Sequence, residues 1–328
     1  MRIPRFEYVR AGSIEEGVEV LGRHGEKAKV LAGGTDLLVN MKYGVVRPEV
    51  VVSVKGIPEL QGIAIKEQAR IGSCVNLTDL AGNGPVGEKY PAFGEAVRSV
   101  ASKHIRNMAM LGGNVCLDTR CWYFNQSRLW RDGRERCHKA GGSVCHAIKG
   151  STRCHAINGS DTAPVLVALG GKIVVAKKGG SRTIPARDFY QDDGIRHTAL
   201  EAGDLVTGVD LPDEGGRSTF IKVSMRKGLD FAVGNIAAWV KGNGKGLSGA
   251  RLVIGSIASR PIFLERASKA VMDSGLTEKG IAEAAGIGRM ELGTLTNLFS
   301  TAGYKRHLTE VLVKRALEEL RSGKTGSR

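Results

Sequence analysis

The stretch VLAGGTDL, residues 30–37, is the most informative part of this chain. An apolar run that suits a short buried strand passes into a Gly-Gly turn, and a helix is expected to begin at Leu37. Such a unit presents backbone N–H groups at a helix N-terminus, an arrangement that binds diphosphates. The pattern is neither a GxGxxG dinucleotide fingerprint nor a Walker loop, and an ordinary turn accounts for the same residues.

A second segment, MLGGN at 110–114, has the same order of apolar residues, paired glycines and a polar residue, about 80 positions further along. Glycine lets a backbone approach a ligand closely. Two such segments together predict a pair of loops that grip the two halves of one extended ligand.

The remaining hydrophobic pattern predicts short strands and helices before residue 100 and again after residue 162. The expected strands are 29–32, 50–54, 69–73, 172–176, 220–223, 237–241 and 250–254, and the expected helices are 14–21, 37–42, 93–100, 267–273, 281–285 and 305–321. Residues 212–216 interrupt the pattern and predict a linker or long turn.

Composition excludes several classes of protein. The 328 residues are 42% hydrophobic and 25% charged, and the 45 glycines follow no collagen period, so the chain is neither disordered nor fibrous. No stretch approaches the roughly 20 apolar residues that span a bilayer, and the N-terminus lacks the apolar core of a secretion signal. We therefore expect a cytoplasmic protein with reduced cysteines and no membrane contact. The net charge of +15 predicts anionic partners without distinguishing nucleic acid, a phosphate-bearing ligand or an acidic protein.

Residues 115–160 follow no regular period and hold five of the six cysteines, namely Cys116, Cys121, Cys137, Cys145 and Cys154. Disulfides are disfavoured in the cytoplasm, and a structural zinc site lacks its usual closely spaced cysteine pairs here. We favour an iron–sulfur cluster, because a four-iron cube takes four thiolates at irregular spacing. Cys116, beside the second glycine segment, is the odd one out, and the distant Cys74 is expected in the core.

The surroundings of these cysteines are basic. Eight basic and two acidic residues lie between residues 120 and 155. Cations offset the negative charge of a thiolate-bound cluster, although each arginine taken alone is typical of a solvated loop. His138, His146 and His155 each follow a cysteine directly and are expected to support the site rather than ligate metal, because adjacent side chains in extended backbone point oppositely.

These motifs together resemble a known family. LAGGTD at 31–36, LGGN at 111–114 and SDTAP at 160–164 are similar to the FAD-binding medium subunits of the molybdenum hydroxylases, which include flavin portions of xanthine dehydrogenase and carbon monoxide dehydrogenase. The similarity covers the whole chain. About 40 additional residues after the second motif, with GNVCLDTRC at 113–121 and FNQS at 124–127, resemble the 4-hydroxybenzoyl-CoA reductase branch of this family, whose beta subunit holds a 4Fe-4S cluster there.

The resemblance implies an α+β fold. It consists of an FAD-binding fold of the PCMH (vanillyl-alcohol oxidase-like) type in two subdomains, and a C-terminal α+β domain of the CO dehydrogenase flavoprotein type. The implied boundaries are 1–56 and 57–215 for the FAD-binding subdomains, 117–157 for an iron–sulfur insertion within the second, and 216–328 for the C-terminal domain.

The resemblance also implies the site residues. Cys121, Cys137, Cys145 and Cys154 would ligate the cluster. The residues expected to contact FAD are Val30, Leu31, Ala32, Gly33, Gly34, Thr35, Asp36, Leu37, Val100, Met110, Leu111, Gly112, Gly113, Asn114, Asp161, Val206 and Lys222. Asp161 would hydrogen-bond the flavin, and Lys222 would line its pocket unless it is simply a surface lysine on a strand. The family usually has a hydroxyl side chain where Met110 stands, so the backbone donors of Gly112 and Gly113 would serve instead.

The implied function is electron transfer. The chain would pair with a molybdenum-cofactor large subunit and a small subunit with two 2Fe-2S clusters, in a dimer of heterotrimers, and would act in the reductive dehydroxylation of 4-hydroxybenzoyl-CoA. Ferredoxin would donate the electrons and dock on the basic surface of residues 120–155. Two alternatives remain, a hydroxylase subunit serving another aromatic or N-heterocyclic substrate and a zinc-stabilised nucleic-acid-binding protein. We expect no nucleic-acid partner.

Overall fold

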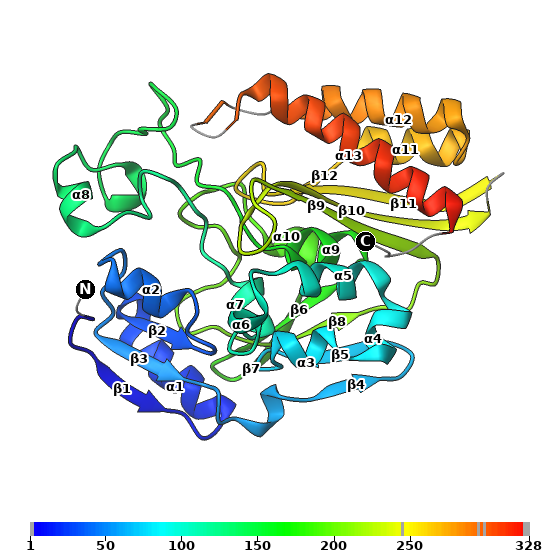
Figure 1. The fold of residues 1–328 in the computed structure, drawn as a ribbon. Helices are drawn as coiled ribbons and strands as arrows, with labels where there is room; N and C mark the ends of the chain where they lie inside the picture. Colours follow the sequence, from blue (N-terminus) through cyan, green and yellow to red (C-terminus); the bar gives the residue numbers. More distant parts are fainter. Residues whose placement is uncertain (1–2, 244–245, 294–295, 298–299, 324–328) are drawn as a thin grey trace.

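The computed structural model describes residues 3–243, 246–293, 296–297 and 300–323, and its strands form three separate sheets (Figure 1). The mixed α+β class predicted from the sequence is confirmed. Within the described residues, no helix is both long and apolar enough to cross a bilayer.

The N-terminal sheet is parallel, with strand order β1-β3-β2. Its strands are β1 (Glu7–Arg10), β2 (Ala28–Leu31) and β3 (Val50–Ser53). All four residues of β3 are buried, as expected for the central strand of a parallel sheet. Helix α1 (Ile14–His24) packs beside these strands, and the Ser13 hydroxyl caps it by accepting a hydrogen bond from the Glu16 amide. Strand β2 leads through residues 32–36 into helix α2 (Leu37–Lys42).

The second sheet is antiparallel, with order β4-β5-β8-β6-β7. Its strands are β4 (Ile63–Ile65), β5 (Ala69–Gly72), β6 (Lys172–Lys177), β7 (Gly180–Pro185) and β8 (Leu205–Leu211). The helices of this region are α3 (Leu77–Ala81), α4 (Gly84–Lys89), α5 (Pro91–Ser99), α6 (Lys103–Arg106), α7 (Leu111–Val115), α9 (Thr162–Ala168) and α10 (Ala186–Phe189). Because β5 pairs with β8, the chain between these two strands starts and ends at neighbouring positions in the sheet.

The third sheet is antiparallel and lies between two layers of helices (Figure 1). Its strands are β9 (Arg217–Ser224), β10 (Ala232–Asn243), β11 (Gly246–Gly255) and β12 (Ile262–Phe263), and its covering helices are α11 (Glu265–Ser274), α12 (Glu278–Glu291) and α13 (Ala302–Ser322). Alternate residues of β10 serve different cores: Ile236 and Ala238 pack in the core under these helices, whereas Ala237 and Trp239 pack in the core around α5 and α9. This period of two is the pattern of a strand buried on both faces.

The expected strands and helices are present, and most extend a few residues beyond the expected limits. Helix α1, for example, continues to His24. Strand β1 and the short helices α3, α4 and α6 were not predicted, because segments of four to six residues carry too few periodic positions. The 3-10 turns are η1 (Gly25–Lys27), η2 (Pro58–Leu60) and η3 (His138–Ala140).

The cysteine-rich segment forms a lobe that projects beside α2 (Figure 1). Arg120 and Ile157 exchange both backbone hydrogen bonds, 2.7 and 2.8 Å long, and this bridge closes the segment at its base. The regular structure inside it is confined to α8 (Arg128–Asp132) and η3, which agrees with the lack of periodicity in the sequence. We call residues 121–156 the cysteine loop.

Candidate functional site

The first glycine segment packs against the backbone that leads into the second. A β-carbon added to Gly33 would collide with the carbonyl oxygen of Met108 and come within 2.9 Å of the α-carbon of Ala109. Glycine at position 33 therefore allows the first loop to lie directly against the backbone that leads into the second segment.

The first loop has unused backbone donors. Residues 32–36 are half-buried, and within the described part of the chain no hydrogen bond is donated by the amides of Gly33, Gly34, Thr35 and Asp36. Gly34 has a φ of 74°, which turns the chain towards α2 at little cost. A half-buried row of free N–H groups beside a helix start fits an anionic diphosphate.

The second segment is a one-turn helix, α7, rather than an open loop. The Gly112 amide donates to the Ser73 carbonyl oxygen at 2.7 Å and is thus engaged within the protein, whereas the sequence predicted it as a ligand donor. The Gly113 α-carbon faces open space, with no heavy atom within 4 Å of where a side chain would begin. Gly113 is therefore the glycine of this pair that a ligand can approach.

The side chains of Met110 and Leu111 point into two different cores, and both are buried. Leu111 packs with Val100 and Val206, whereas Met110 packs with Cys74 and residues of the first sheet. Cys74 is thus a core residue, as predicted. The buried side chains of Met110 and Leu111 therefore anchor the α7 backbone, and they contribute no polar group to a site.

Asp36 links the first glycine loop to the cysteine loop. Its carboxylate accepts a hydrogen bond from the Arg120 guanidinium at 2.6 Å and another from the Asn40 amide at 2.8 Å. Burial raises the pKa of Asp36, and the charge of Arg120 offsets part of that shift. Arg120 immediately precedes Cys121, so this ion pair fixes one end of the cysteine loop beside the predicted FAD loop. In the sequence, Arg120 is only one of the eight basic residues between 120 and 155.

Asp161 and Lys222 form a buried ion pair with a separation of 2.6 Å. The Lys222 ammonium also donates to the Ser99 carbonyl oxygen at 3.0 Å, next to Val100, so three of the residues predicted to line the flavin pocket lie together. Lys222 is not a surface lysine, because its side chain is only 11% exposed. Burial raises the pKa of Asp161, and the adjacent ammonium offsets part of the shift.

Asn235 completes this pair and was not anticipated. Its side-chain amide donates to the free oxygen of Asp161 at 3.1 Å, and its own Oδ1 is buried without a protein partner in the described chain. Asn235 lies opposite Lys222 in the β9–β10 register, which is a relationship between strands that no local pattern indicates.

Asn114 connects α7 to the start of α9. Its Oδ1 accepts hydrogen bonds from the hydroxyls of Ser160, at 2.9 Å, and Thr162, at 2.7 Å. These residues flank Asp161, so the second glycine segment and the SDTAP motif form one hydrogen-bonded unit. Two further predicted residues lie on strands. Val30 is exposed on β2, an edge strand of the first sheet, and Val206 is buried on β8.

The histidines of the cysteine loop hold the loop together. His138 hydrogen-bonds the Ser151 carbonyl oxygen at 2.9 Å, and His155 hydrogen-bonds the Ser151 hydroxyl at 2.7 Å. His146 hydrogen-bonds the Glu135 carbonyl oxygen at 2.8 Å. All three rings thus have hydrogen-bond partners inside the loop, and the role predicted for them, to support the site rather than ligate metal, stays a prediction.

Four cysteines of the loop lie close enough to act on one another electrostatically. Burial raises the pKa of Cys121, and Cys137 and Cys145 raise it further. Burial likewise raises the pKa of Cys154 to about 11, with Cys121 and Cys137 acting in the same direction. Within the residues that the structure describes, no three His, Cys, Asp or Glu side chains converge tightly enough to hold one metal ion. The thiols are therefore grouped without forming a single-ion site.

Cys116 stands apart from this group. It caps the C-terminal end of α7, and burial raises the pKa of its thiol to about 12. Its thiol acts electrostatically on Tyr190, a core residue, rather than on the cysteines of the loop.

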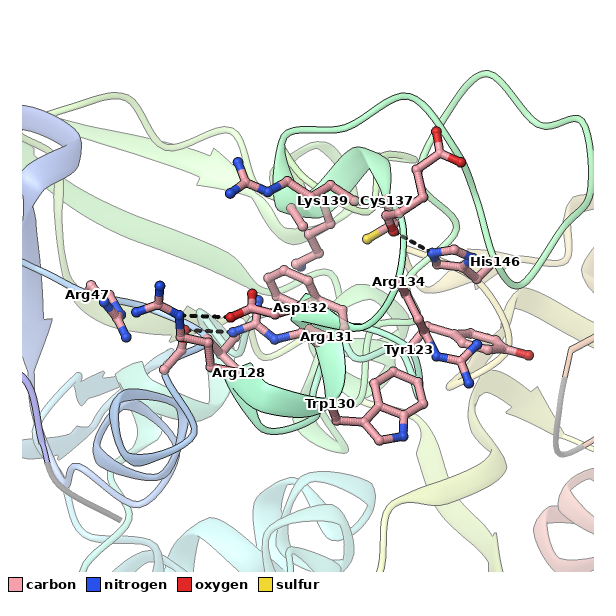
Figure 2. Close-up of a pocket in the computed structure, with 16 residues that line it drawn as sticks. Arg47, Tyr123, Arg128, Trp130, Arg131, Asp132, Arg134, Cys137, Lys139 and His146 are labelled. Atoms are coloured by element: carbon pink, nitrogen blue, oxygen red, sulfur yellow. Dashed lines mark hydrogen bonds and ion pairs between the residues drawn. The ribbon is translucent and has the colours of Figure 1, made fainter.

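A cavity of about 640 Å³ lies between the cysteine loop and the end of α2 (Figure 2). Figure 2 shows Cys137 beside His146 on one side of the cavity, and Arg47 and Arg128 on the other. Its cationic lining residues are Arg47, Arg128, Arg131, Arg134, Arg136 and Lys139. Asp132 and Glu135 are its acidic lining residues, so the cavity is strongly basic.

Helix α8 holds this cavity against the turn that follows α2. The Arg128 amide donates to the Tyr43 carbonyl oxygen at 3.0 Å, and the Arg131 guanidinium donates to the Gly44 carbonyl oxygen at 2.7 Å. The aromatic residues support the cations, since the Arg134 guanidinium lies 4.3 Å from the centre of the Trp130 ring.

Comparison with known proteins agrees with this geometry. Residues 4–214 match the FAD binding domain in molybdopterin dehydrogenase, and residues 219–320 match the CO dehydrogenase flavoprotein C-terminal domain. The FAD-binding subunit PaoB of an aldehyde oxidoreductase from Escherichia coli K12 is 32% identical over 305 residues, which cover 88% of this chain and 91% of that protein. The carbon monoxide dehydrogenase medium chain of Hydrogenophaga pseudoflava is 26% identical over 319 residues, 96% of either chain.

Solved structures share the architecture. Carbon monoxide dehydrogenase from Hydrogenophaga pseudoflava aligns with a TM-score of 0.81 at 25% identity, over 98% of this chain and 99% of that one. Quinoline 2-oxidoreductase from Pseudomonas putida 86 has the same fold, with a TM-score of 0.81 at 22% identity over 99% and 100% of the two chains. The chain therefore belongs to the family of FAD-binding medium subunits of the molybdenum hydroxylases.

Proposed function

We propose that this chain is the FAD- and 4Fe-4S-carrying electron-transfer subunit of a molybdenum enzyme of the 4-hydroxybenzoyl-CoA reductase type. The observation that carries the proposal is the grouping of Cys121, Cys137, Cys145 and Cys154 in a loop that the Asp36–Arg120 ion pair joins to the FAD loop. Thiolates are the usual ligands of iron–sulfur clusters. The same four cysteines were assigned from the sequence resemblance, and that ligand assignment remains a prediction.

The residues of the two loops would hold the two groups side by side. The free amides of Gly33 to Asp36 and the open face of Gly113 would receive the diphosphate-bearing part of FAD. The buried Asp161–Lys222 pair would present fixed charge to the flavin, with both side chains restrained by Asn235 and Ser99. A bound flavin exchanges electrons singly or in pairs, so it can connect a two-electron molybdenum centre to one-electron carriers.

The substrate chemistry belongs to another subunit. Removal of the ring hydroxyl of 4-hydroxybenzoyl-CoA as water consumes two electrons and two protons and leaves benzoyl-CoA. We place this step on a molybdenum-cofactor large subunit, with a small 2Fe-2S subunit completing a dimer of cytoplasmic heterotrimers. The names of relatives as medium chains of dehydrogenases support such an assembly. Ferredoxin would supply the electrons at the basic cavity.

A second candidate is a medium subunit that passes electrons outward from a different substrate. It is supported by the range of relatives, which includes an aldehyde oxidoreductase and a nicotine 6-hydroxylase. Assay of the assembled complex with 4-hydroxybenzoyl-CoA and reduced ferredoxin, against aldehydes and N-heterocycles with an electron acceptor, separates the two. The zinc-stabilised nucleic-acid-binding alternative is set aside, because family membership explains both glycine segments through FAD.

Metal analysis of Cys137→Ser tests the cluster directly. We expect the anaerobically purified wild-type protein to contain FAD, four irons and four acid-labile sulfides per chain, as a 4Fe-4S cube requires. Cys137→Ser should lose most of the iron and sulfide and keep its FAD, because residue 137 lies outside the glycine segments.

Cys116→Ala is the matched control and should keep both groups, since Cys116 lies apart from the four loop cysteines. Full iron content in Cys137→Ser, or loss of iron from the control, would show that the ligand set is wrong. Wild-type protein with FAD but without iron and sulfide would reject the cluster itself.

A further inference from the structure

Lys139 carries a buried ammonium inside the cysteine loop, most of whose other residues are half-buried or exposed. Its side chain is only 6% exposed, and its ammonium lies 2.6 Å from an Asp118 carboxylate oxygen. It also lies 2.5 Å from the Thr119 hydroxyl, 3.1 Å from the Thr119 carbonyl oxygen and 2.8 Å from the Gly194 carbonyl oxygen. An ammonium has three donor hydrogens, so these oxygens use all of its hydrogen-bonding capacity.

These contacts join three separate segments of the chain. Lys139 belongs to the cysteine loop, Asp118 and Thr119 precede it, and Gly194 lies between α10 and β8. The Thr119 hydroxyl donates to the same Gly194 carbonyl oxygen at 2.5 Å, which closes the arrangement. The neighbouring His197 lies 3.6 Å from Asp118, and burial lowers the pKa of its imidazole.

Gly194 lies directly against one of the four grouped cysteines. A β-carbon at residue 194 would come within 2.6 Å of the Cys154 sulfur, and the Gly194 amide donates to the Cys154 carbonyl oxygen at 3.3 Å. Lys139 therefore holds the Gly194 backbone, against which the Cys154 side chain packs. The same side chain lines the basic cavity together with Cys137.

We propose that Lys139 is a positioning residue of the cluster: it fastens the cysteine loop to residues 118–119 and 194, and its fixed positive charge sets the reduction potential of the group that the cysteines bind. This inference rests on the proposed 4Fe-4S cluster. A reduced cluster carries one more negative charge than an oxidised one, so a nearby cation favours reduction and a nearby anion opposes it.

Two substitutions, one that removes a positive charge and one that removes a negative charge, test the proposal in the complete purified complex. Lys139→Met removes the cation and should lower the midpoint potential of the cluster and release part of its iron. Asp118→Asn removes the anion but keeps an oxygen that can accept from Lys139, and should raise the potential at unchanged iron content. Lys139→Arg keeps the charge and should restore a potential near the wild-type value.

Lys149→Met is the control, because this substitution removes the same charge from an exposed residue of the same loop. The measurements are iron, sulfide and FAD content, and a redox titration followed by the electron paramagnetic resonance signal of the reduced cluster. A merely structural role predicts shifts of one sign in both Lys139→Met and Asp118→Asn. Shifts of equal sign, or none, would overturn the proposal.

If Lys139→Met does not fold, Asp118→Asn decides the matter alone: a raised potential supports the proposal and an unchanged one rejects it. Failure of the proposed function is seen separately, as wild-type protein that binds FAD and has no cluster signal to titrate. That result would overturn the role of Lys139 as well.

Discussion

Gly33 illustrates how one missing side chain sets the distance between two parts of this molecule. The loop that contains it and the backbone at 108–109 are in direct contact, and a β-carbon would displace one from the other. The amides of residues 33–36 would then move relative to the backbone that leads into α7. The position thus requires glycine for packing, and ligand geometry depends on that packing.

Gly33→Ala should lower the free energy of unfolding by about 1–3 kcal/mol, the usual cost of overpacking, and reduce the FAD content of the purified protein. Gly22→Ala is the matched control, because Gly22 is exposed on α1 with no heavy atom within 4 Å of an added β-carbon, and it should stabilise the protein by up to about 1 kcal/mol. Urea denaturation and flavin absorbance after gel filtration measure both effects. Equal stability of Gly33→Ala and wild type would contradict the close contact.

At the scale of elements, α13 packs on the third sheet and buries a lysine near its first turn. Lys305 is 3% exposed, and burial lowers its pKa from 10.5 to about 8. Between these two pH values the unfolded chain binds more protons at this residue than the folded chain does. Stability contributed by this residue therefore rises with pH from 8 to about 10.5 and is lowest below pH 8.

Lys305→Met removes this dependence. The free energy of unfolding of the variant minus that of wild type should decrease as pH rises above 8, by up to about 1.4 kcal/mol per pH unit. Lys314→Met, on the same helix with a side chain 60% exposed, should show a difference that stays constant with pH. Urea titrations from pH 7 to pH 10 provide the measurement. A constant difference for Lys305→Met would mean that the folded-state pKa is near its ordinary value.

At the scale of the whole molecule, the chain has a net charge of +15, and cationic side chains gather around the basic cavity. Arg47, which comes from outside the cysteine loop, adds to the arginines of α8 and the residues that follow it. A surface of this kind speeds encounter with an acidic protein through long-range attraction, which salt screens.

Electron transfer from reduced ferredoxin should slow by several-fold to about tenfold between low and physiological ionic strength. Arg47→Glu should lower the rate at low salt and flatten its salt dependence. Lys279→Glu makes the same change in net charge on α12, far from α8 in Figure 1, and should have a smaller effect. Stopped-flow measurement of flavin reduction in the complex provides the rate. Indifference to ionic strength would reject docking at this surface.

The elements with several periodic positions were predictable from the chain. Ser13 marks the start of α1, the valines at 50–52 mark a buried strand, and the glycines at 33–34 mark the turn between β2 and α2. Short helices such as α7 were missed, because five residues show no period and two of them are glycines. The ligand role of the four cysteines stays a prediction that iron analysis will test.

Local patterns along the chain were enough to indicate the glycine turns and a thiol-rich loop, since neighbouring residues produce those signals, and the resemblance of the motifs to a known family implied the fold class. The pairings within the site depend on contacts between distant positions: Asp36 meets Arg120 across 84 residues, and Asp161 meets Lys222 across 61. Burial of such pairs follows from how sheets and helices pack against each other. Packing joins residues whose separation along the chain carries no periodic signal, and so the folded molecule alone reveals which charges are neutralised and which donors remain free.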